Sequence, residues 1–415
     1  MGETVRGRQF VGFGFGPIQA GLMLCEAIES GSFDGLTVAE VDQGLVDAVR
    51  ANGSSVTINV AGRDGVRAKR LSGIRLCNPR VPADRKELVA AVRESEEMAT
   101  AVPSVALYSA GGDSSIAAIL AEGATPGRQR IVYTAENDNF AAEKLSKEVA
   151  TRSSGRDLPG LQVLNTVIGK MSGVVSSERE MKELGLSPLV PGFDKCVLVE
   201  EFNRILVSRV TLPGFVRGIR VFEEKNDLLP FEEAKLYGHN AIHALLGYLA
   251  RLRGHSVMST IRQDFALLSL GGRAFLEESG AALVRKHGGA AAREPLFTPA
   301  GWSAYAEDLI QRMTNPWLHD GVERIVRDPV RKLGWSDRFF GTMRIAMEQE
   351  IEPRAMALGA AAALSFAGEL EKKPAPPVEL LSRIWGGDAV GAERNACVRL
   401  VLEALEKLPA WTARA

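Results

Sequence analysis

The segment QFVGFGFGPIQAGLM, residues 9–23, sets the architecture of the first half of this chain. A short apolar, strand-like stretch runs into a glycine-rich loop and then into a helix-like stretch, with Gly14, Gly16 and Gly21 near the junction. Glycines at this place let the backbone approach a pyrophosphate closely, and the helix N-terminus that follows favours negative charge. Gln19 stands where the third glycine of GxGxxG is usual, and a bare GxG is also common in turns without a ligand. The loop alone therefore leaves a dinucleotide site and an ordinary turn both open.

The second strand-like stretch, LTVAEVDQ (36–43), favours the dinucleotide site. It carries Glu40 and Asp42 at its end, about twenty residues beyond the glycine loop. A carboxylate there can accept hydrogen bonds from both ribose hydroxyls of adenosine and repels a 2′-phosphate. No arginine follows directly, so the sequence favours NAD over NADP. The same two acids would also suit a plain turn at a strand end.

Two later stretches, MATAVPS (98–104) and YTAEN (133–137), are polar endings of strands. Parallel sheets bind their ligands at the carboxyl ends of the strands. We therefore expect Thr100 and Asn137 to meet the nicotinamide half of a dinucleotide, although capping residues would give the same pattern.

Residues 8 to about 220 alternate short β-type runs with helix-type stretches, which predicts a parallel sheet covered by helices on both faces. The stretch TINVAGRDGVRAKRLSGIRLC (57–77) is typical of a small hairpin within that sheet. The expected strands are QFVGFG, LTVAEV, ALYSA, RIVYTA and LQVLNTV.

Long amphipathic stretches dominate after about residue 225, for example AIHALLGYLARLRG (241–254), with apolar residues at three- and four-residue spacing. We expect an α/β chain with a sheet domain over residues 1–222 and an all-α domain over residues 223–415.

Composition excludes several classes of function. The chain has 415 residues, 46% hydrophobic and 24% charged, with a formal net charge of −1, so it lacks the field that draws nucleic acid or an anionic membrane. Its four cysteines are far apart and form no metal-binding spacing, which indicates a reducing compartment. The apolar run near the N-terminus is too short and glycine-rich for an export signal, and no run of about eighteen apolar residues occurs. We expect a cytoplasmic protein, monomeric or a small homo-oligomer.

The stretch KLYGHNAIH (235–243) concentrates proton-handling side chains, although the chain has only five histidines. On a helix, Lys235, His239, Asn240 and His243 share an arc of about 140°. Oxidation of an alcohol needs a base for the hydroxyl proton and donors for the developing alkoxide, and a partly buried lysine with Asn and His fits both needs. From spacing alone, a solvated helix start is the slightly better interpretation. No third ligand completes a metal site with the two histidines.

The pattern K-x4-N-x2-H formed by Lys235, Asn240 and His243 resembles the signature of the polyol-specific long-chain dehydrogenase/reductase family. The likeness extends over most of the chain. GFGPIQAGL (14–22) resembles the family's shortened glycine loop, and NPWLHDGVERIVRDPVRKL (315–333) resembles a segment of its helical domain. ATAVPS (99–104) and TAEN (134–137) are similar to its cofactor-contacting strand ends.

The resemblance implies an N-terminal Rossmann-type NAD-binding domain, a helical catalytic domain and an active site in the cleft between them. Lys235 would be the general acid/base, Asn137 and Asn240 would hold the substrate oxygen, and His243 would orient substrate or lysine. Glu232 would help a proton reach water, or is a surface carboxylate. The expected cofactor-binding residues are Gly14, Gly16, Pro17, Ile18, Glu40, Thr100 and Ala101.

The chain departs from the family after Asn165, where NTVIGKMS has Gly169 and Lys170 in place of the expected Asp and Arg. A lysine keeps one positive charge but loses the two-pronged grip of arginine. Lys170 and Arg331, together with Lys332, are the candidates for binding a phosphate on the substrate. His239 is an extra histidine that we interpret as a helix-surface residue.

These features predict an NAD-dependent oxidoreductase that interconverts a sugar alcohol, as a phosphate ester such as mannitol 1-phosphate, and its keto sugar. A second reading keeps the chemistry but takes a free polyol or a hexuronate. A third is a catalytically idle NAD-binding sensor or assembly protein, because the segment with Gly169 and Lys170 is altered.

Overall fold

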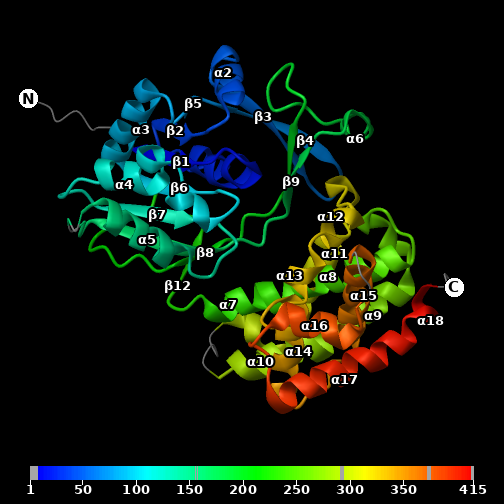
Figure 1. The fold of residues 1–415 in the computed structure, drawn as a ribbon. Coiled ribbons are helices and arrows are strands. Elements are labelled where there is room, and N and C mark those ends of the chain that lie inside the picture. Colours follow the sequence, from blue (N-terminus) through cyan, green and yellow to red (C-terminus); the bar gives the residue numbers. More distant parts are fainter. Residues whose placement is uncertain (1–7, 155, 157, 290–293, 372–374, 413–415) are drawn as a thin grey trace, which may run out of the picture. The chain divides into compact units, whose positions relative to one another are not determined.

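The chain divides into two compact units, Met1–Leu228 and Leu229–Ala415, in a computed structural model (Figure 1). The first seven residues, which belong to the stretch examined for an export signal, lie outside the described residues. The structure describes every residue except 1–7, 155, 157, 290–293, 372–374 and 413–415.

Twelve strands are found among the described residues of the first unit, and all belong to one of two sheets. They are β1 (Gln9–Phe13), β2 (Gly35–Ala39), β3 (Ser55–Ala61), β4 (Val66–Ser72), β5 (Ile74–Cys77), β6 (Ser95–Thr100), β7 (Arg130–Thr134), β8 (Leu161–Val167), β9 (Ser172–Val175), β10 (Cys196–Glu200), β11 (Leu206–Ser208) and β12 (Glu223–Lys225).

The larger sheet has the order β12-β11-β8-β7-β6-β1-β2-β5. From β8 to β5 every neighbouring pair is parallel, and only β11 runs antiparallel to its neighbour β8. The strand order therefore reverses direction at β1, between β6 on one side and β2 on the other. In such sheets a ligand-binding crevice opens at the carboxyl ends of the strands at this reversal. The predicted α/β class with a parallel sheet is confirmed.

The smaller sheet has the order β4-β3-β10-β9 and corrects one prediction. The expected hairpin is present as β3 and β4, but it does not lie within the main sheet, because β3 pairs with β10 rather than with β2 or β5. Figure 1 shows this hairpin beyond the end of the larger sheet.

The helices of the first unit connect the strands, and most are short. They are η1 (Gln19–Leu24), α1 (Cys25–Glu29), α2 (Gln43–Ala51), α3 (Pro82–Glu94), η2 (Val105–Tyr108), η3 (Gly112–Ser114), α4 (Ile116–Gly123), α5 (Ala141–Arg152) and α6 (Glu178–Glu183).

Helices cover both faces of the larger sheet, as the alternation of side chains along its strands requires. On β1, Val11 and Phe13 are buried against α3, α4 and α5, while Phe10 is buried on the opposite face with η1 and α2. The expected strand ALYSA (106–110) is wrong, because Val105–Tyr108 forms the 3₁₀ turn η2 instead.

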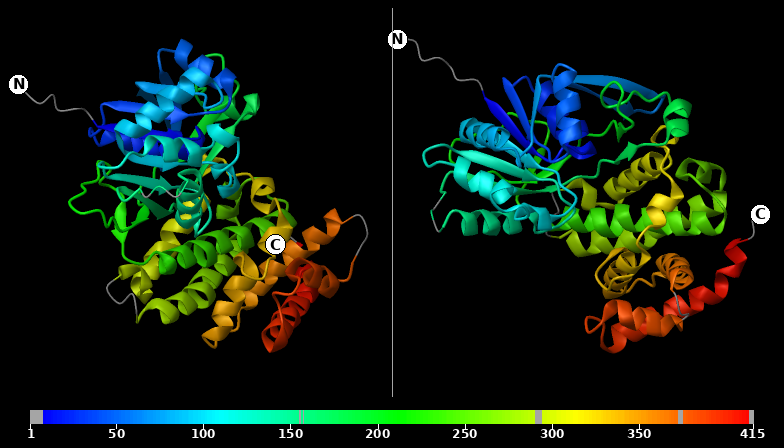
Figure 2. Two further views of the ribbon diagram at one scale, coloured as in Figure 1. Left: turned by 60° about the vertical axis from the view of Figure 1, so that its left-hand side comes forward. Right: turned by 45° about the horizontal axis from the view of Figure 1, so that its top comes forward.

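The described residues of the second unit form helices and turns, so the predicted all-α character of this part is confirmed. α17 packs along α15, and both views of Figure 2 show them side by side. The elements are α7 (Leu229–Glu233), η4 (Ala234–Asn240), α8 (Ala241–Leu252), η5 (Met258–Gln263), α9 (Phe265–Arg273), η6 (Ala274–Gly280), α10 (Ala281–His287), η7 (Pro295–Phe297), α11 (Pro299–Met313), η8 (Pro316–Leu318), α12 (Val322–Val326), α13 (Pro329–Lys332), α14 (Arg338–Glu348), α15 (Arg354–Leu370), α16 (Pro377–Trp385), α17 (Gly391–Lys407) and α18 (Pro409–Thr412).

Among the described residues, no helix combines the length and the apolar character needed to cross a bilayer. All four cysteines are buried, and none forms a disulfide.

Candidate functional site

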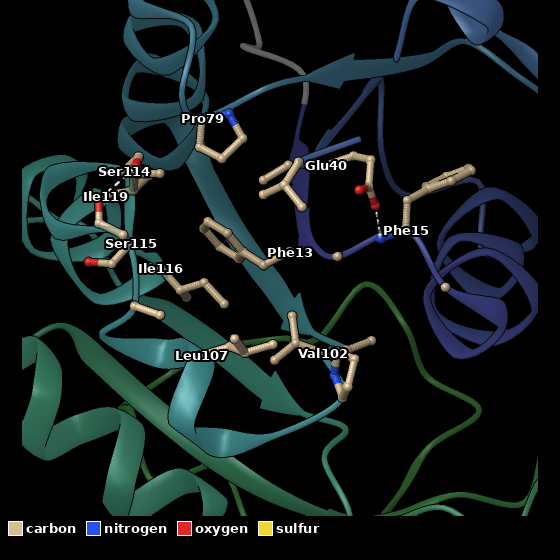
Figure 3. Close-up of a pocket in the computed structure, with 18 of the residues that line it drawn as sticks. Phe13, Phe15, Glu40, Pro79, Val102, Leu107, Ser114, Ser115, Ile116 and Ile119 are labelled. Atoms are coloured by element: carbon tan, nitrogen blue, oxygen red, sulfur yellow. Dashed lines mark hydrogen bonds between the residues drawn. The ribbon is translucent and has the colours of Figure 1, made fainter. Parts of the chain in front are cut away.

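A cavity of about 630 Å³ lies at the carboxyl ends of β1, β2, β5 and β6, where the strand order of the larger sheet reverses. Its walls are mostly apolar, and Phe13, Leu107 and Ile116 lie around it in Figure 3. One wall is the glycine loop after β1, and the opposite wall comes from η2, η3 and the start of α4. An apolar cavity of this kind, with a few polar groups at a switch point, is a typical nucleotide site.

The glycine loop has the geometry that the sequence predicts. Gly14 has a φ of +83°, and a Cβ there would lie 2.7 Å from the carbonyl oxygen of Ala101. Both facts require glycine at this position. At Gly16 an added Cβ would meet nothing within 4 Å, so the loop leaves open space on its cavity side. Pro17 begins the helix, where its missing N–H costs nothing.

Gln19 replaces the third glycine without closing the site. Its side chain is fully buried, and a Cβ on Gly12 would lie 2.2 Å from its Nε2 atom. The glutamine thus fills space behind β1 that Gly12 leaves open. Gly21 serves packing, because a Cβ there would lie 2.4 Å from Val199 of the smaller sheet.

Six of the seven expected cofactor-binding residues line the cavity: Gly14, Gly16, Pro17, Ile18, Glu40 and Ala101. Thr100 does not line it, because its side chain is fully buried and its hydroxyl donates to Glu136 at 2.8 Å.

Glu40 is half-buried at the end of β2, and both of its carboxylate oxygens accept backbone hydrogen bonds. Oε2 accepts from the N–H of Phe15 at 3.0 Å (Figure 3), and Oε1 accepts from Asp42 at 2.8 Å. The carboxylate is thereby fixed against the glycine loop. Asp42 caps α2 by accepting from Leu45 at 3.2 Å, so its side chain has a structural role.

Glu136 is a residue that sequence reasoning missed. It is buried at the end of β7, and it accepts hydrogen bonds from Thr100, from the N–H of Val102 at 2.9 Å and from the Tyr108 hydroxyl. Burial raises the pKa of its carboxyl group, and these three donors oppose that rise. The carboxylate ties the segment after β6, which forms a wall of the cavity, to β7. The only signal in the sequence was its place beside Asn137, which is exposed.

The segment KLYGHNAIH lies in a continuous helix through α7, η4 and α8, and η4 is a π turn. A π turn frees a backbone carbonyl from its usual partner. Here the carbonyl of Tyr237 accepts instead from the hydroxyls of Ser279 at 2.8 Å and Thr342 at 3.3 Å. Two neighbouring helical elements thus hold this turn in place, and π turns are frequent at functional sites.

Lys235 is half-buried in this turn, and its pKa is lowered from the ordinary 10.5 to about 8. Burial is the largest cause and the positive charge of Arg338 the second, while Glu232 opposes both. A lysine with this pKa exchanges protons near neutral pH, as a general acid/base must. The expectation of a lysine with lowered pKa agrees with this environment.

His239 is buried, so its interpretation as a helix-surface residue is wrong. Burial lowers its pKa well below the ordinary value, and the charges of His243, Arg312, Lys235 and Arg338 add to this effect. The ring is therefore neutral at neutral pH. Its position one turn from His243, with ring centroids 6.3 Å apart, follows from the four-residue spacing.

His243 has a carboxylate partner that fixes its ring. Its Nε2 atom lies 2.9 Å from Oδ2 of Asp320, a buried residue just before α12. The other oxygen, Oδ1, accepts from Arg324 at 2.8 and 2.6 Å. Burial alone would raise the pKa of Asp320, but His243 and Arg324 outweigh it and lower the pKa. Asn240 is half-buried, and its side chain makes no hydrogen bond with a described residue.

The expected phosphate-binding residues lie in three different surroundings. Lys170 is buried in the first unit, where its Nζ donates to the carbonyl of Phe202 at 2.9 Å and to Asn203 at 3.2 Å. Arg331 is exposed and lies 3.2 Å from Asp328. Lys332 is buried, and burial followed by the charge of Arg338 lowers its pKa to about 8. Their role in binding substrate stays a prediction.

Comparison with known proteins agrees with this geometry. Residues 227–383 match the family described as the mannitol dehydrogenase C-terminal domain. Mannitol-1-phosphate 5-dehydrogenase of Exiguobacterium sibiricum is 29% identical over 360 residues, which cover 86% of this chain and 85% of that protein. The resemblance seen in the sequence is confirmed.

Two solved structures share the fold. Pseudomonas fluorescens mannitol 2-dehydrogenase, in a ternary complex with NAD and D-mannitol, matches with a TM-score of 0.70 at 15% identity, covering 99% of this chain and 95% of that one. A D-sorbitol dehydrogenase in substrate-free form also matches with a TM-score of 0.70, at 14% identity, covering 98% and 92%.

Proposed function

We propose that this chain is an NAD-dependent dehydrogenase that interconverts a sugar alcohol phosphate and its keto sugar, because residues 227–383 match the mannitol dehydrogenase C-terminal domain family. The observation that carries the proposal is Lys235, with its pKa lowered to about 8, one and two helical turns from His239 and His243 in the matched domain. An idle sensor would have little use for a lysine in this state.

The cavity of the first unit fits NAD. Gly14 and Gly16 give the close backbone approach that a pyrophosphate needs, and the helix that begins at Pro17 follows directly. Glu40 presents a fixed carboxylate that suits the two ribose hydroxyls of adenosine. NAD, when bound, supplies the acceptor for the hydride that leaves the alcohol carbon.

The residues of the second unit manage the proton and the substrate oxygen. Neutral Lys235 accepts the hydroxyl proton as the alcohol is oxidised, and its ammonium form returns a proton in the reverse direction. Asn240 donates to the oxygen as charge develops on it. His243, whose Nε2 side faces Asp320, keeps Nδ1 for a hydroxyl of the substrate. Asn137 of the first unit remains a candidate second donor to the oxygen.

A phosphate on the substrate is supported by the positive charges around Lys235. Arg338 is buried and acts electrostatically on Lys235, His239 and Lys332, while Arg312 acts on His239. Arg338 lies 2.7 Å from Asp337, and Arg312 lies 3.4 Å from Asp308. Cations are nevertheless the main charged neighbours of Lys235 and His239. Such surroundings would attract a dianion. The relative from Exiguobacterium sibiricum is named for a phosphorylated substrate, mannitol 1-phosphate.

The test is oxidation of NADH at neutral pH with keto-hexoses, with and without phosphate, for the wild type and Lys235→Ala. We expect turnover of a ketose phosphate, with a loss of about 10²- to 10⁴-fold in the variant. Turnover confined to an unphosphorylated ketose or a hexuronate would keep the chemistry and change the substrate. Tight NADH binding without turnover on the whole panel would favour the idle protein. Wild-type turnover that survives in Lys235→Ala would refute the role of the lysine.

A further inference from the structure

Arg80 lies on the wall of the same cavity as Glu40, although it comes from a different strand end. Its strand, β5, pairs in parallel with β2, so that Cys77 is opposite Ala39. The pairing continues for one more residue, because the N–H of Glu40 donates to the carbonyl of Cys77 at 3.0 Å. The residues that follow the two strands are therefore neighbours. Arg80 stands three residues beyond Cys77, at the end of the cavity to which Glu40 belongs.

The turn that carries Arg80 is fixed by Asn78, which is buried. The N–H of Asn78 donates to Asp84 at 2.7 Å, and its Nδ2 donates to Gln43 at 2.8 Å. Its Oδ1 accepts the N–H of Arg80 at 3.0 Å. The backbone of Arg80 is thus tied to α2, which follows Glu40, and to α3. These hydrogen bonds fix the turn at the rim of the cavity.

The guanidinium of Arg80 is exposed and makes no hydrogen bond or ion pair with a described residue. Two other arginines nearby are engaged. Arg50 donates to the carbonyl of Leu76 at 2.9 Å and to Asp84 at 2.8 Å, and Arg75 lies 3.8 Å from Glu87. Among the described residues that line the cavity, Arg80 is the one with a positively charged side chain.

We propose that Arg80 is a coenzyme-specificity residue that accepts the 2′-phosphate of NADP. Two side chains then determine the relative affinity for NAD and NADP. Glu40 favours NAD because its carboxylate suits the free ribose hydroxyls, and Arg80 favours NADP because its planar set of donors matches a phosphate. This inference rests on the proposed binding of a dinucleotide. It adds to the expectation of NAD from the sequence: no arginine follows the second strand directly, but the pairing of β5 with β2 brings Arg80 to the same end of the cavity.

The experiment is calorimetric titration of the apoprotein with NADH and with NADPH, which requires no turnover. The variants are Arg80→Ala, Arg80→Lys and Glu40→Gln, with Arg75→Ala as the control that removes the same charge from β5 but does not line the cavity. We expect the wild type to bind NADH more tightly than NADPH and still to bind both. Arg80→Ala should reduce the affinity for NADPH by about tenfold more than the affinity for NADH, as loss of one charge-assisted contact predicts.

The remaining variants separate the contributions. Glu40→Gln should raise the affinity for NADPH relative to that for NADH. In the double variant Glu40→Gln/Arg80→Ala, this gain should disappear. Arg80→Lys should keep part of the NADPH affinity, and Arg75→Ala should leave both affinities unchanged. An equal loss of affinity for NADH and NADPH in Arg80→Ala, or no change in either affinity, would overturn this proposal without contradicting the proposed dehydrogenase function. Failure of the wild type to bind either dinucleotide would overturn both.

Discussion

Replacing Arg338 by methionine should raise the pKa of Lys235 and shift the pH dependence of alcohol oxidation upward. The pKa of Lys235 is about 8 instead of 10.5 because burial, and then the charge of Arg338, disfavours the ammonium form. This depression is worth about 3.4 kcal/mol at about 1.36 kcal/mol per pKa unit. We assign about one unit to Arg338, the size that one neighbouring charge commonly produces.

The rate at neutral pH should then change by a defined factor. At pH 7, a lysine with a pKa near 8 is neutral in about one tenth of the molecules, and one with a pKa near 9 in about one hundredth. Oxidation by Arg338→Met should be about tenfold slower at pH 7 and should approach the wild-type rate near pH 10. Reduction needs the ammonium form, so the variant should keep its reductive activity to a pH about one unit higher.

The assay is kcat in both directions at saturating substrates between pH 6 and 10.5, with thermal melting to verify folding. Arg344→Met is the matched control, because Arg344 lies on the same helix and lies 3.1 Å from Glu393 but is no cause of the Lys235 shift. An oxidation profile of Arg338→Met with an unchanged midpoint and a uniformly lower rate would show that Arg338 does not set the pKa of Lys235.

Three further substitutions test the supports of the site. Asp320→Asn should lower kcat/KM by about tenfold, because the ring of His243 loses the carboxylate that orients it, whereas Arg324→Ala should have a smaller effect. Steady-state kinetics would measure the loss, and thermal melting would separate it from misfolding. Gly14→Ala should lower the free energy of unfolding by about 2–4 kcal/mol and abolish NADH binding. Its control is Gly53→Ala, where φ is +65° but no atom lies close, and denaturant unfolding should show a loss of only about 1 kcal/mol. Glu136→Gln should weaken NADH binding severalfold in calorimetry with the affinity for substrate little changed; an unaltered NADH affinity would contradict the role of this carboxylate in shaping the cavity.

The sequence predicts the parallel part of the fold well because its strands are apolar and separated by helices of ordinary pattern. The prediction fails where a strand buries polar side chains. The first half of β6, SEE (95–97), has no apolar residue and was not among the expected strands. Glu97 is nevertheless fully buried, and it accepts from the Tyr133 hydroxyl at 2.9 Å and from the N–H of Gly218. A carboxylate satisfied by partners so distant in sequence cannot be recognised from local hydrophobicity.

The strands after β8 were missed for a related reason. β9 and β10 build a second sheet with β3, and the pairing of Leu198 with Asn59 spans much of the chain. Short strands of this kind are defined by their partners rather than by their own pattern. ALYSA shows the opposite error, since its β-type composition lies in a turn on the cavity wall.

The candidate site follows the same division. Lys235, Asn240 and His243 could be identified because a family pattern links them within one helix. Asp320 lies 77 residues beyond His243, and only the fold places its carboxylate 2.9 Å from the ring. Arg80 likewise depends on the pairing of β5 with β2.

The groups that hold the site therefore differ in kind from the groups that act in it. Asp320 fixes a histidine, and Glu136 fixes a loop. Ser279 and Thr342 hold the carbonyl that the π turn releases at Tyr237, two residues from Lys235. None of these supports needs to touch substrate, but each determines where an acting side chain can stand. Removing the hydroxyls of Ser279 and Thr342 would take two donors from the carbonyl of Tyr237. This loss favours return to ordinary α-helical bonding, which would rotate Lys235 relative to the helix beyond it. The π turn is thus the element through which distant helices control the position of Lys235.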